Sequence, residues 1–213
     1  MELVILTVVF FALAAFGVGL WWYSADHVGK RRLKNLESTP IADAPDGSLV
    51  KITGKLVRAV DEGLEGPLTG RRCTGYVIEV KERTYSGANV NWHTIVMQED
   101  AVSFVVEDAT GSALVKAAGA HLVLVRDGHL RSGDLAENSE RAEAFLLANG
   151  TPSENILRMK KSIRYEEGVL EPGEEVSVLG VGTWGTDGDG AKRLVLEASP
   201  EHPLTISDDP STL

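Results

Sequence analysis

Residues 73–85, CTGYVIEVKERTY, alternate between apolar and polar side chains with a period of two. Because successive side chains of a strand point to opposite faces, this stretch predicts a β-strand with two distinct faces. One face would carry Tyr76, Ile78 and Val80, and the other Val77, Glu79 and Lys81. Residues 48–60, SLVKITGKLVRAV, show the same period, with Gly54 as an expected bulge or kink. The chain is therefore expected to be mainly β.

Turn-forming residues separate further strand-like runs along the chain. These runs occupy 102–108, 112–118, 121–128, 162–182 around a Pro-Gly turn, and 192–198. One stretch, residues 140–150, has helical spacing, with Ser139 as its cap and Gly150 at its end. Five-stranded barrels of the OB type have strands of this kind, so we expect an OB-like small β-barrel with one helix inserted between strands. Residues 85–101 are expected to form a loop that holds at most a short strand.

The N-terminal residues 3–23, LVILTVVFFALAAFGVGLWWY, contain no charged side chain. A helix of this length spans about 31 Å, which matches the hydrocarbon core of a bilayer. The stretch begins at Leu3 and ends in a set of residues typical of an interfacial aromatic belt, namely Trp21, Trp22 and Tyr23. A cleaved signal peptide is the alternative, but Glu2 stands where that class has a basic residue. We expect an uncleaved transmembrane helix.

A basic cluster follows this span, formed by Lys30, Arg31, Arg32 and Lys34. The positive-inside rule then predicts a single-pass protein with its large C-terminal domain in the cytoplasm. The cluster also suits contact with anionic headgroups of the lipid bilayer, and a solvated linker is the alternative interpretation. The expected segments are the anchor at 1–24, a basic juxtamembrane segment and linker at 25–47, the barrel domain at 48–198, and a frayed tail at 199–213.

Composition excludes several classes of function. The net charge is −10, and the residues after position 37 comprise 28 acidic against 17 basic side chains. A nucleic-acid surface needs concentrated Lys and Arg, so no nucleic-acid partner is expected. Cys73 is the only cysteine of the sequence, which excludes an intramolecular disulfide framework and a cysteine-rich zinc module.

Local motifs favour no catalytic, metal or cofactor site. Residues 180–185 spell GxGxxG, but the TDGDG that follows cannot open the helix on which a pyrophosphate would bind. The histidines are scattered without metal-ligand spacing. Cys73 has Arg71 and Arg72 as neighbours, which favours a reactive thiolate, yet a strand cysteine facing the core is the simpler interpretation. We expect no cofactor and no enzymatic activity in this chain itself.

Four segments together resemble the GIDE domain, also called the beside-a-membrane (BAM) domain. They are GPLTGRRCTGY at 66–76, SFVVEDATGSALV at 103–115, EEGVLEPGEEVSVLGVG at 166–182 and PLTIS at 203–207. This domain occurs in mitochondrial membrane-anchored RING-type ubiquitin ligases and in bacterial membrane proteins, where it lies between two membrane spans. The present sequence shows one span. A RING would need about eight Cys and His ligands, which a sequence with one cysteine does not supply.

The resemblance and the apolar span together imply a non-catalytic adaptor or scaffold that binds an unknown protein partner beside the membrane. The alternative is a component of a ubiquitin-ligase-like or other membrane enzyme system, with catalysis supplied by other groups or partners. The candidate partner surface comprises Tyr85, Trp92 and His93, large side chains without a periodic place in a strand. The sequence leaves open whether they instead fold back to cap the barrel, and it does not indicate an oligomeric state.

Overall fold

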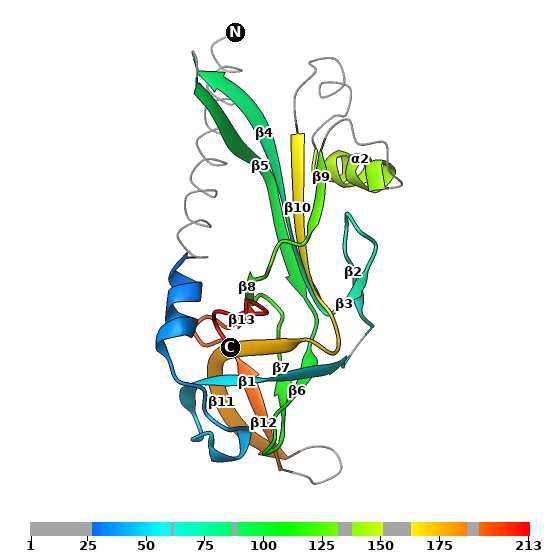
Figure 1. Ribbon diagram of the computed structural model, residues 1–213. Coiled ribbons are helices and arrows are strands. Elements are labelled where there is room, and N and C mark those ends of the chain that lie inside the picture. The colour runs from blue at the N-terminus through cyan, green and yellow to red at the C-terminus, as the bar shows by residue number, and fades with distance from the viewer. Residues whose placement is uncertain (1–26, 61, 87–88, 132–137, 151–162, 187–191) are drawn as a thin grey trace.

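The computed structural model describes residues 27–60, 62–86, 89–131, 138–150, 163–186 and 192–213, arranged as in Figure 1. The helical segments are residues 27–35, the 3-10 helix η1 Ile41–Asp43 and the helix α2 Asn138–Ala148. The strands before α2 are β1 Ser48–Ala59, β2 Leu64–Glu65, β3 Arg72–Cys73, β4 Gly75–Ser86, β5 Asn89–Ala101, β6 Phe104–Glu107, β7 Ser112–Val115, β8 His121–Val123 and β9 Gly128–Arg131. The strands after α2 are β10 Ile163–Leu170, β11 Glu175–Thr186, β12 Lys192–Glu197 and β13 Thr205–Ser207.

Five strands close into a barrel in the order β1-β6-β7-β12-β11, and β11 pairs back with β1. Neighbouring strands are antiparallel except β7 and β12, which run parallel. Two further strands, β13 and β8, extend the sheet from β11. When the barrel strands are numbered in chain order, their spatial order is 1-2-3-5-4. The structure therefore confirms a mainly β chain with a five-stranded barrel.

The first part of the long strand β1 pairs with β11 and its last part pairs with β6. Gly54 lies where the pairing changes from one neighbour to the other. Lys55 is paired with Glu175 of β11 on one side and with Glu107 of β6 on the other. A Cβ atom added at Gly54 would lie 2.5 Å from the backbone oxygen of Glu107, closer than any side chain tolerates. Glycine is needed here because two backbones approach each other where the barrel closes.

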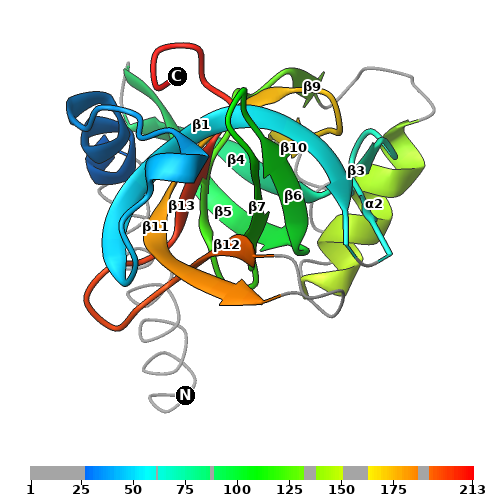
Figure 2. The same cartoon turned by 90° about the horizontal axis from the view of Figure 1, so that it is seen from below.

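A second sheet, in the order β5-β4-β10-β9, is built from two insertions into the barrel. Strands β2 to β5 lie between β1 and β6 in the chain, and β8, β9, α2 and β10 lie between β7 and β11. In Figure 1 this sheet projects from one end of the barrel, and the β4–β5 hairpin reaches farthest. Figure 2 views the molecule from the opposite, barrel end, with α2 at the side.

The two sheets have separate hydrophobic cores. The barrel core includes Ile52, Leu56, Phe104 and Leu194, all fully buried. The second core lies between the projecting sheet and α2, and Phe145 and Leu146 of the helix contribute to it. The two faces predicted for residues 73–85 are confirmed, because Tyr76, Ile78 and Val80 join the second core whereas Val77 joins the barrel core.

The predicted inserted helix is confirmed as α2. It begins at Asn138, one residue before the expected cap Ser139. Gly150 follows it with a φ of +71°, a left-handed conformation that ends helices at low cost only in glycine.

The prediction of a loop at 85–101 is wrong, because most of this segment is β5, which pairs with β4 along its whole length. The pairing shifts register where Val80 lies opposite Val96 and Lys81 lies opposite Thr94. One residue of β5 is therefore extra at this bulge, and the alternation of side chains changes phase there. This change of phase hides the period of two that identifies strands in a sequence.

The prediction of a frayed C-terminal tail at 199–213 is also wrong. Its residues 205–207 form β13, which lies between β11 and β8. The Ser177 hydroxyl donates a hydrogen bond to the Thr212 carbonyl over 2.7 Å, and both side chains are fully buried. Pairing with strands far away in the sequence outweighs a local composition of Pro and Asp that favours coil.

The segment at 25–47, which composition identifies as a linker, is attached to the domain at several points within residues 27–47. Leu33 and Ile41 are buried. Asp108 accepts a hydrogen bond from the Ile41 backbone N–H at 2.8 Å, and the Trp184 indole N–H donates to the Ala44 carbonyl at 2.8 Å. These contacts join the segment to the rest of the domain.

The predicted anchor at residues 3–23 lies outside the described residues. Within the described ranges, no helix combines the length and the apolar character that a membrane crossing requires.

Candidate functional site

The β4–β5 hairpin carries all three residues of the predicted partner surface. Tyr85 lies on β4 and is 69% exposed, while Trp92 on β5 is 39% exposed. The cross-strand pairs at this end of the hairpin are Tyr85–Val90, Arg83–Trp92 and Glu82–His93. Paired residues share a face and successive residues alternate, so Tyr85 and Trp92 lie on one face and His93 on the other. The structure thus brings together two of the three predicted residues.

Two arginines outside the predicted partner surface lie against these aromatic rings. The guanidinium carbon of Arg83 is 5.0 Å from the ring centroid of Tyr85. That of Arg164, on β10, is 5.1 Å from the ring centroid of Trp92. Both distances are within the range of attractive cation–π contacts. The spacing of Arg83 and Tyr85 two apart on a predicted strand signals their shared face, whereas no local signal connects Arg164 with Trp92.

Further along the same face, cations and carboxylates neutralise each other. The Lys81 ammonium lies 2.8 Å from Glu166 and 2.9 Å from Glu79, and Arg164 lies 3.2 Å from Glu166. Burial lowers the pKa of Lys81, but its hydrogen bonds to Glu166 and Glu79 outweigh burial and raise the pKa above the ordinary value. In Glu166 burial likewise opposes ionisation, and the hydrogen bond from Lys81 holds the pKa below the ordinary value.

A fully buried carboxylate, Glu167 of β10, ties together two of the segments that resemble the GIDE domain. Its oxygens accept hydrogen bonds from the backbone N–H of Leu68 at 2.6 Å and of Thr69 at 3.2 Å, and from the Thr69 hydroxyl at 2.5 Å. A Cβ atom at Gly66 would lie 2.8 Å from the same carboxylate. The loop at 66–71 is therefore held on β10 by a buried acceptor, which is a structural role.

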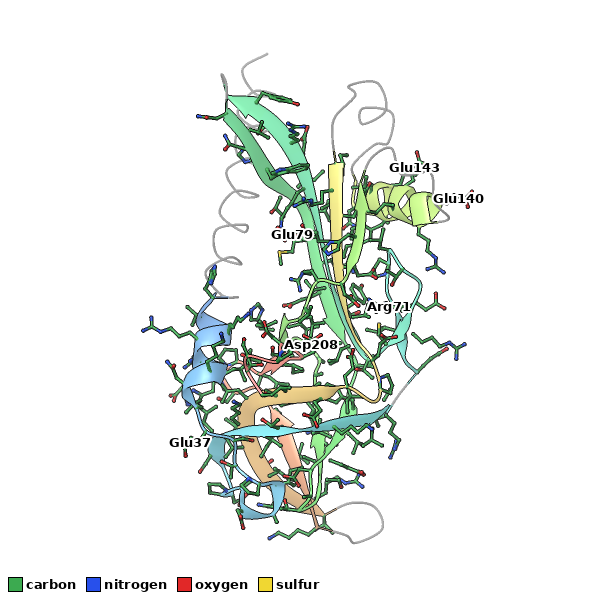
Figure 3. All side chains as sticks on the ribbon, in the orientation of Figure 1. Glu37, Arg71, Glu79, Glu140, Glu143 and Asp208 are labelled. Atoms are coloured by element: carbon green, nitrogen blue, oxygen red, sulfur yellow. The ribbon has the colours of Figure 1, made fainter. Side chains whose placement is uncertain are left out.

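Arg71, at the end of this loop, makes a bidentate ion pair. Its two terminal nitrogens donate to the Asp127 oxygens at 2.8 and 2.6 Å, and one of them also lies 3.2 Å from Glu171. The hydrogen bond from Arg71 holds the pKa of Asp127 below its ordinary value. Figure 3 labels Arg71 and Asp208 near the junction of the barrel with the projecting sheet.

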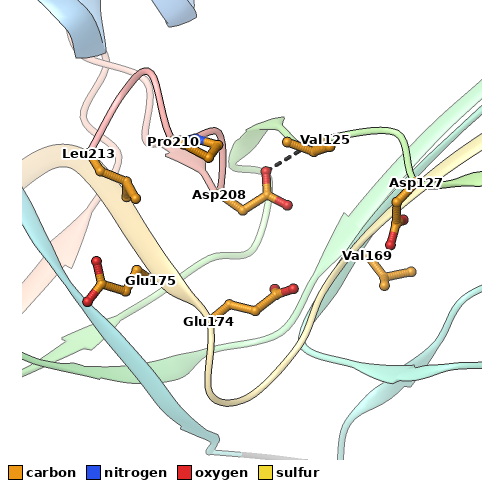
Figure 4. A pocket seen from close by; sticks show the side chains of 8 residues that line it. All are labelled: Val125, Asp127, Val169, Glu174, Glu175, Asp208, Pro210 and Leu213. Carbon is orange, nitrogen blue, oxygen red and sulfur yellow. Dashed lines mark hydrogen bonds between the residues drawn. The ribbon is translucent and has the colours of Figure 1, made fainter.

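Beside this ion pair lies an acidic cleft of about 370 Å³. Its lining comes from segments far apart in the sequence and comprises Val125, Asp127, Val169, Glu174, Glu175, Asp208, Pro210 and Leu213. Figure 4 shows the carboxyl groups of Asp208, Glu174 and Asp127 around one opening. No local pattern indicates this cleft, because no two of these three acids are near each other in the chain.

Burial raises the pKa of Asp208 to about 6, although the Asp208 carboxylate accepts a hydrogen bond from the Val125 N–H at 2.8 Å. Burial also raises the pKa of Glu174. Within the described residues, no group of three or more His, Cys, Asp or Glu is arranged to hold a metal ion.

Cys73 lies on β3 and is buried, as the core interpretation of this residue predicts. Burial, followed by the charge of Glu167, raises the pKa of the thiol to about 11. At neutral pH the side chain is therefore a thiol rather than the nucleophilic thiolate. The GxGxxG at 180–185 lies within the strand β11.

Only the basic residues of the predicted anchor lie within the described part of the chain. Leu3, Trp21, Trp22 and Tyr23 lie outside it. The basic cluster lies on the helical segment at 27–35, where Arg31, Arg32 and Lys34 are exposed. Lys30 instead forms an ion pair with Asp209, which attaches the helix to the C-terminal segment.

Comparison with known families gives one finding. The model of the GIDE family, described as E3 ubiquitin ligase, matches residues 77–212, a range that begins within β4 and extends past β13. The curated proteins and the solved structures contain no match to this chain.

Proposed function

Because this chain belongs to the GIDE family, we propose that it is a single-pass, membrane-anchored, non-catalytic adaptor whose β-rich domain binds a partner protein beside the bilayer. The apolar stretch at 3–23 supplies the anchor in this proposal. The basic cluster at 30–34 then orients the domain toward the cytoplasm.

One contrast carries the proposal. Several polar groups of the family-like segments are engaged in structural bonds, as in the hydrogen bonds from Leu68 and Thr69 to Glu167. The exposed aromatic groups, in contrast, lie on a hairpin that projects from the barrel, with Tyr85 and Trp92 on one face. Exposed aromatic and arginine side chains are enriched where proteins bind one another.

Site-specific photo-crosslinking tests the interaction. Tyr85→benzoylphenylalanine places the reactive group on the hairpin, and Val57→benzoylphenylalanine places it on the barrel strand β1, where Val57 is 40% exposed. In intact membranes we expect one discrete protein adduct at position 85 and none at position 57. Equal adduct patterns at both positions, or no adduct at either, would contradict the proposal.

Topology is tested separately with reporter fusions at the two ends of the full chain. We expect the C-terminal reporter to be active only in the cytoplasm and the protein to resist extraction at alkaline pH. An active C-terminal reporter on the other side of the membrane would refute the orientation that the basic cluster predicts.

The family description favours a second candidate, a subunit of a membrane ubiquitin-ligase system whose catalytic module is on another chain. Purified chain incubated with ubiquitin, activating enzyme and conjugating enzymes is expected to form no ubiquitin conjugates alone. If the protein crosslinked at position 85 is a RING protein or a conjugating enzyme, the chain is an adaptor subunit of a ubiquitin-ligase system, as the second candidate states. Conjugate formation by the purified chain would refute the non-catalytic assignment.

A further inference from the structure

The β5 edge of the projecting sheet has the features of a docking site for an extended segment. We propose that an acidic, extended segment of the partner protein adds to this edge as a fifth strand and places a carboxylate against Arg83 beside Tyr85 and Trp92. This inference rests on the proposed function and specifies the chemistry of its partner.

The first support is the free edge itself. Strand β5 is the outermost strand in the order β5-β4-β10-β9, and within the described residues its ladder is with β4 alone. Its sequence NVNWHTIVMQEDA contains neither Pro nor Lys, the residues that commonly protect an edge from further pairing, and its bulge lies between Thr94 and Val96, away from the hairpin end. An edge of this kind offers backbone N–H and C=O groups to an incoming strand.

The second support is the thinness of the hairpin end. The pairing of β10 with β4 begins at Ile163, which lies opposite Glu82. Beyond that point the described part of the sheet has two strands, and residues 89–93 are all exposed. A two-stranded ribbon is marginally stable in water, so a third strand at this position gains both hydrogen bonds and apolar contact.

The third support is an unsatisfied cation. The Nε atom of Arg83 is buried and has no hydrogen-bond partner, and within the described residues the guanidinium has no carboxylate in ion-pair range. The other two cations on this face, Lys81 and Arg164, both form ion pairs with Glu166. Arg83 therefore retains the planar donor fork that binds a carboxylate in a bidentate manner.

Charge also selects the class of partner. Glu99 and Asp100 near the other end of β5 repel a uniformly acidic strand, so the acidic residue of the segment must lie at the hairpin end. Among the described residues of this face, Arg83 is the one cation without a carboxylate, which matches one carboxylate, whereas an anionic membrane or a nucleic acid requires several free cations side by side. An extended peptide with a localised acidic residue satisfies both conditions.

The test uses the full chain in phosphatidylcholine nanodiscs and three fluorescein-labelled probe peptides. These are VXVTVTVTVT in which X is Glu, Gln or Lys. We expect the Glu peptide to bind most tightly, as measured by fluorescence anisotropy. Arg83→Gln should weaken the Glu peptide about tenfold and leave the Gln peptide unchanged, because only the charged hydrogen bonds are lost. Arg58→Gln, on the exposed side of β1, is the matched control and should leave both affinities unchanged.

Amide hydrogen exchange separates strand addition from other modes of binding. Saturation with the Glu peptide should slow the exchange of residues 89–97, and the exchange of β1 should stay the same. Binding without slower exchange in β5, or equal binding of the Glu and Lys peptides, would overturn the proposal. The proposal would also be overturned if the chain bound phosphatidylserine nanodiscs and bound none of the three peptides.

The two proposals fail in distinguishable ways. If position 85 crosslinks to one protein but no peptide protects β5, the adaptor function stands and strand addition is wrong. If neither the crosslink nor the protection is observed, both proposals are wrong.

Discussion

The buried carboxylate of Glu167 allows the sharpest test of how this fold is held together. It is fully buried and accepts three hydrogen bonds, two of them from the backbone of the loop at 66–71. Glu167→Leu replaces the carboxylate with an apolar side chain of similar size and removes every acceptor. Glu167→Gln keeps one carbonyl oxygen as an acceptor. Its amide NH2 group replaces the other oxygen and faces an N–H or O–H group that the oxygen accepted from.

The magnitude follows from the groups that lose their partner. Leu68 is 1% exposed, so its N–H cannot exchange the lost bond for water without local opening of the loop. An unsatisfied buried donor costs about 1–3 kcal/mol, and the N–H groups of Leu68 and Thr69 both lose their acceptor. We expect Glu167→Leu to lower the free energy of unfolding by about 2–5 kcal/mol, since removal of a buried charge offsets part of the loss. Glu167→Gln should cost about half as much, because one acceptor remains.

The assay is urea unfolding of the full chain in mild detergent, followed by far-UV circular dichroism. Glu201→Gln, an exposed glutamate after β12, is the control and should stay within about 0.5 kcal/mol of the parent. Hydrogen exchange should show that the loop at 66–71 opens first in the Gln variant. If Glu167→Leu unfolds at the same urea concentration as the parent, the loop is not held by this carboxylate and the reasoning fails.

Three other predictions concern the glycine crossover, the acidic cleft and the cysteine. Gly54→Ala should destabilise the chain by about 1–3 kcal/mol in the same urea assay, because the new Cβ meets the backbone of Glu107, whereas Gly185→Ala, with open space around it, should be tolerated. The pKa of Asp208 is about 6 in the folded chain and about 3.9 in the unfolded chain. Between about pH 4 and pH 6 the folded state therefore holds a proton that the unfolded state releases. The free energy of unfolding falls as the pH rises through this range. Asp208→Asn should remove that loss, about 3 kcal/mol for a shift of about two pKa units, and an unchanged slope of stability against pH would contradict the assignment. Cys73, with a pKa of about 11, should resist iodoacetamide at neutral pH in the folded chain and react in urea; rapid labelling of the native protein would show that the thiol is accessible.

The regular strands and the inserted helix were predictable because their signals are local. Alternation over 73–85 identified β4 and assigned its faces correctly, since each side chain reports its own environment. The turn at Pro172 and Gly173 separated β10 from β11 for the same reason, as the φ of +103° at Gly173 requires glycine. The predicted bulge or kink at Gly54 is in the structure a close approach of β1 to β6.

Where prediction failed, the deciding contacts were remote in the chain. The bulge in β5 moved its apolar residues out of phase, so the strand at 89–101 resembled a loop in sequence. The tail was assigned as coil because its composition is polar, while its burial depends on β8 and β11. The acidic cleft was invisible for the same reason, as its carboxylates come from three separate segments.

The sequence by itself determined the class of the chain. It identified a mainly β domain of the GIDE family after an apolar N-terminal stretch, because periodicity, turn residues and motif spacing are properties of short segments. Only the tertiary structure decided that Arg164 lies on Trp92, that Glu167 anchors the loop at 66–71, and that, among the described residues, the buried Nε of Arg83 has no hydrogen-bond partner. These features depend on which strands become neighbours, and strand pairing joins residues whose separation in the chain carries no local signal.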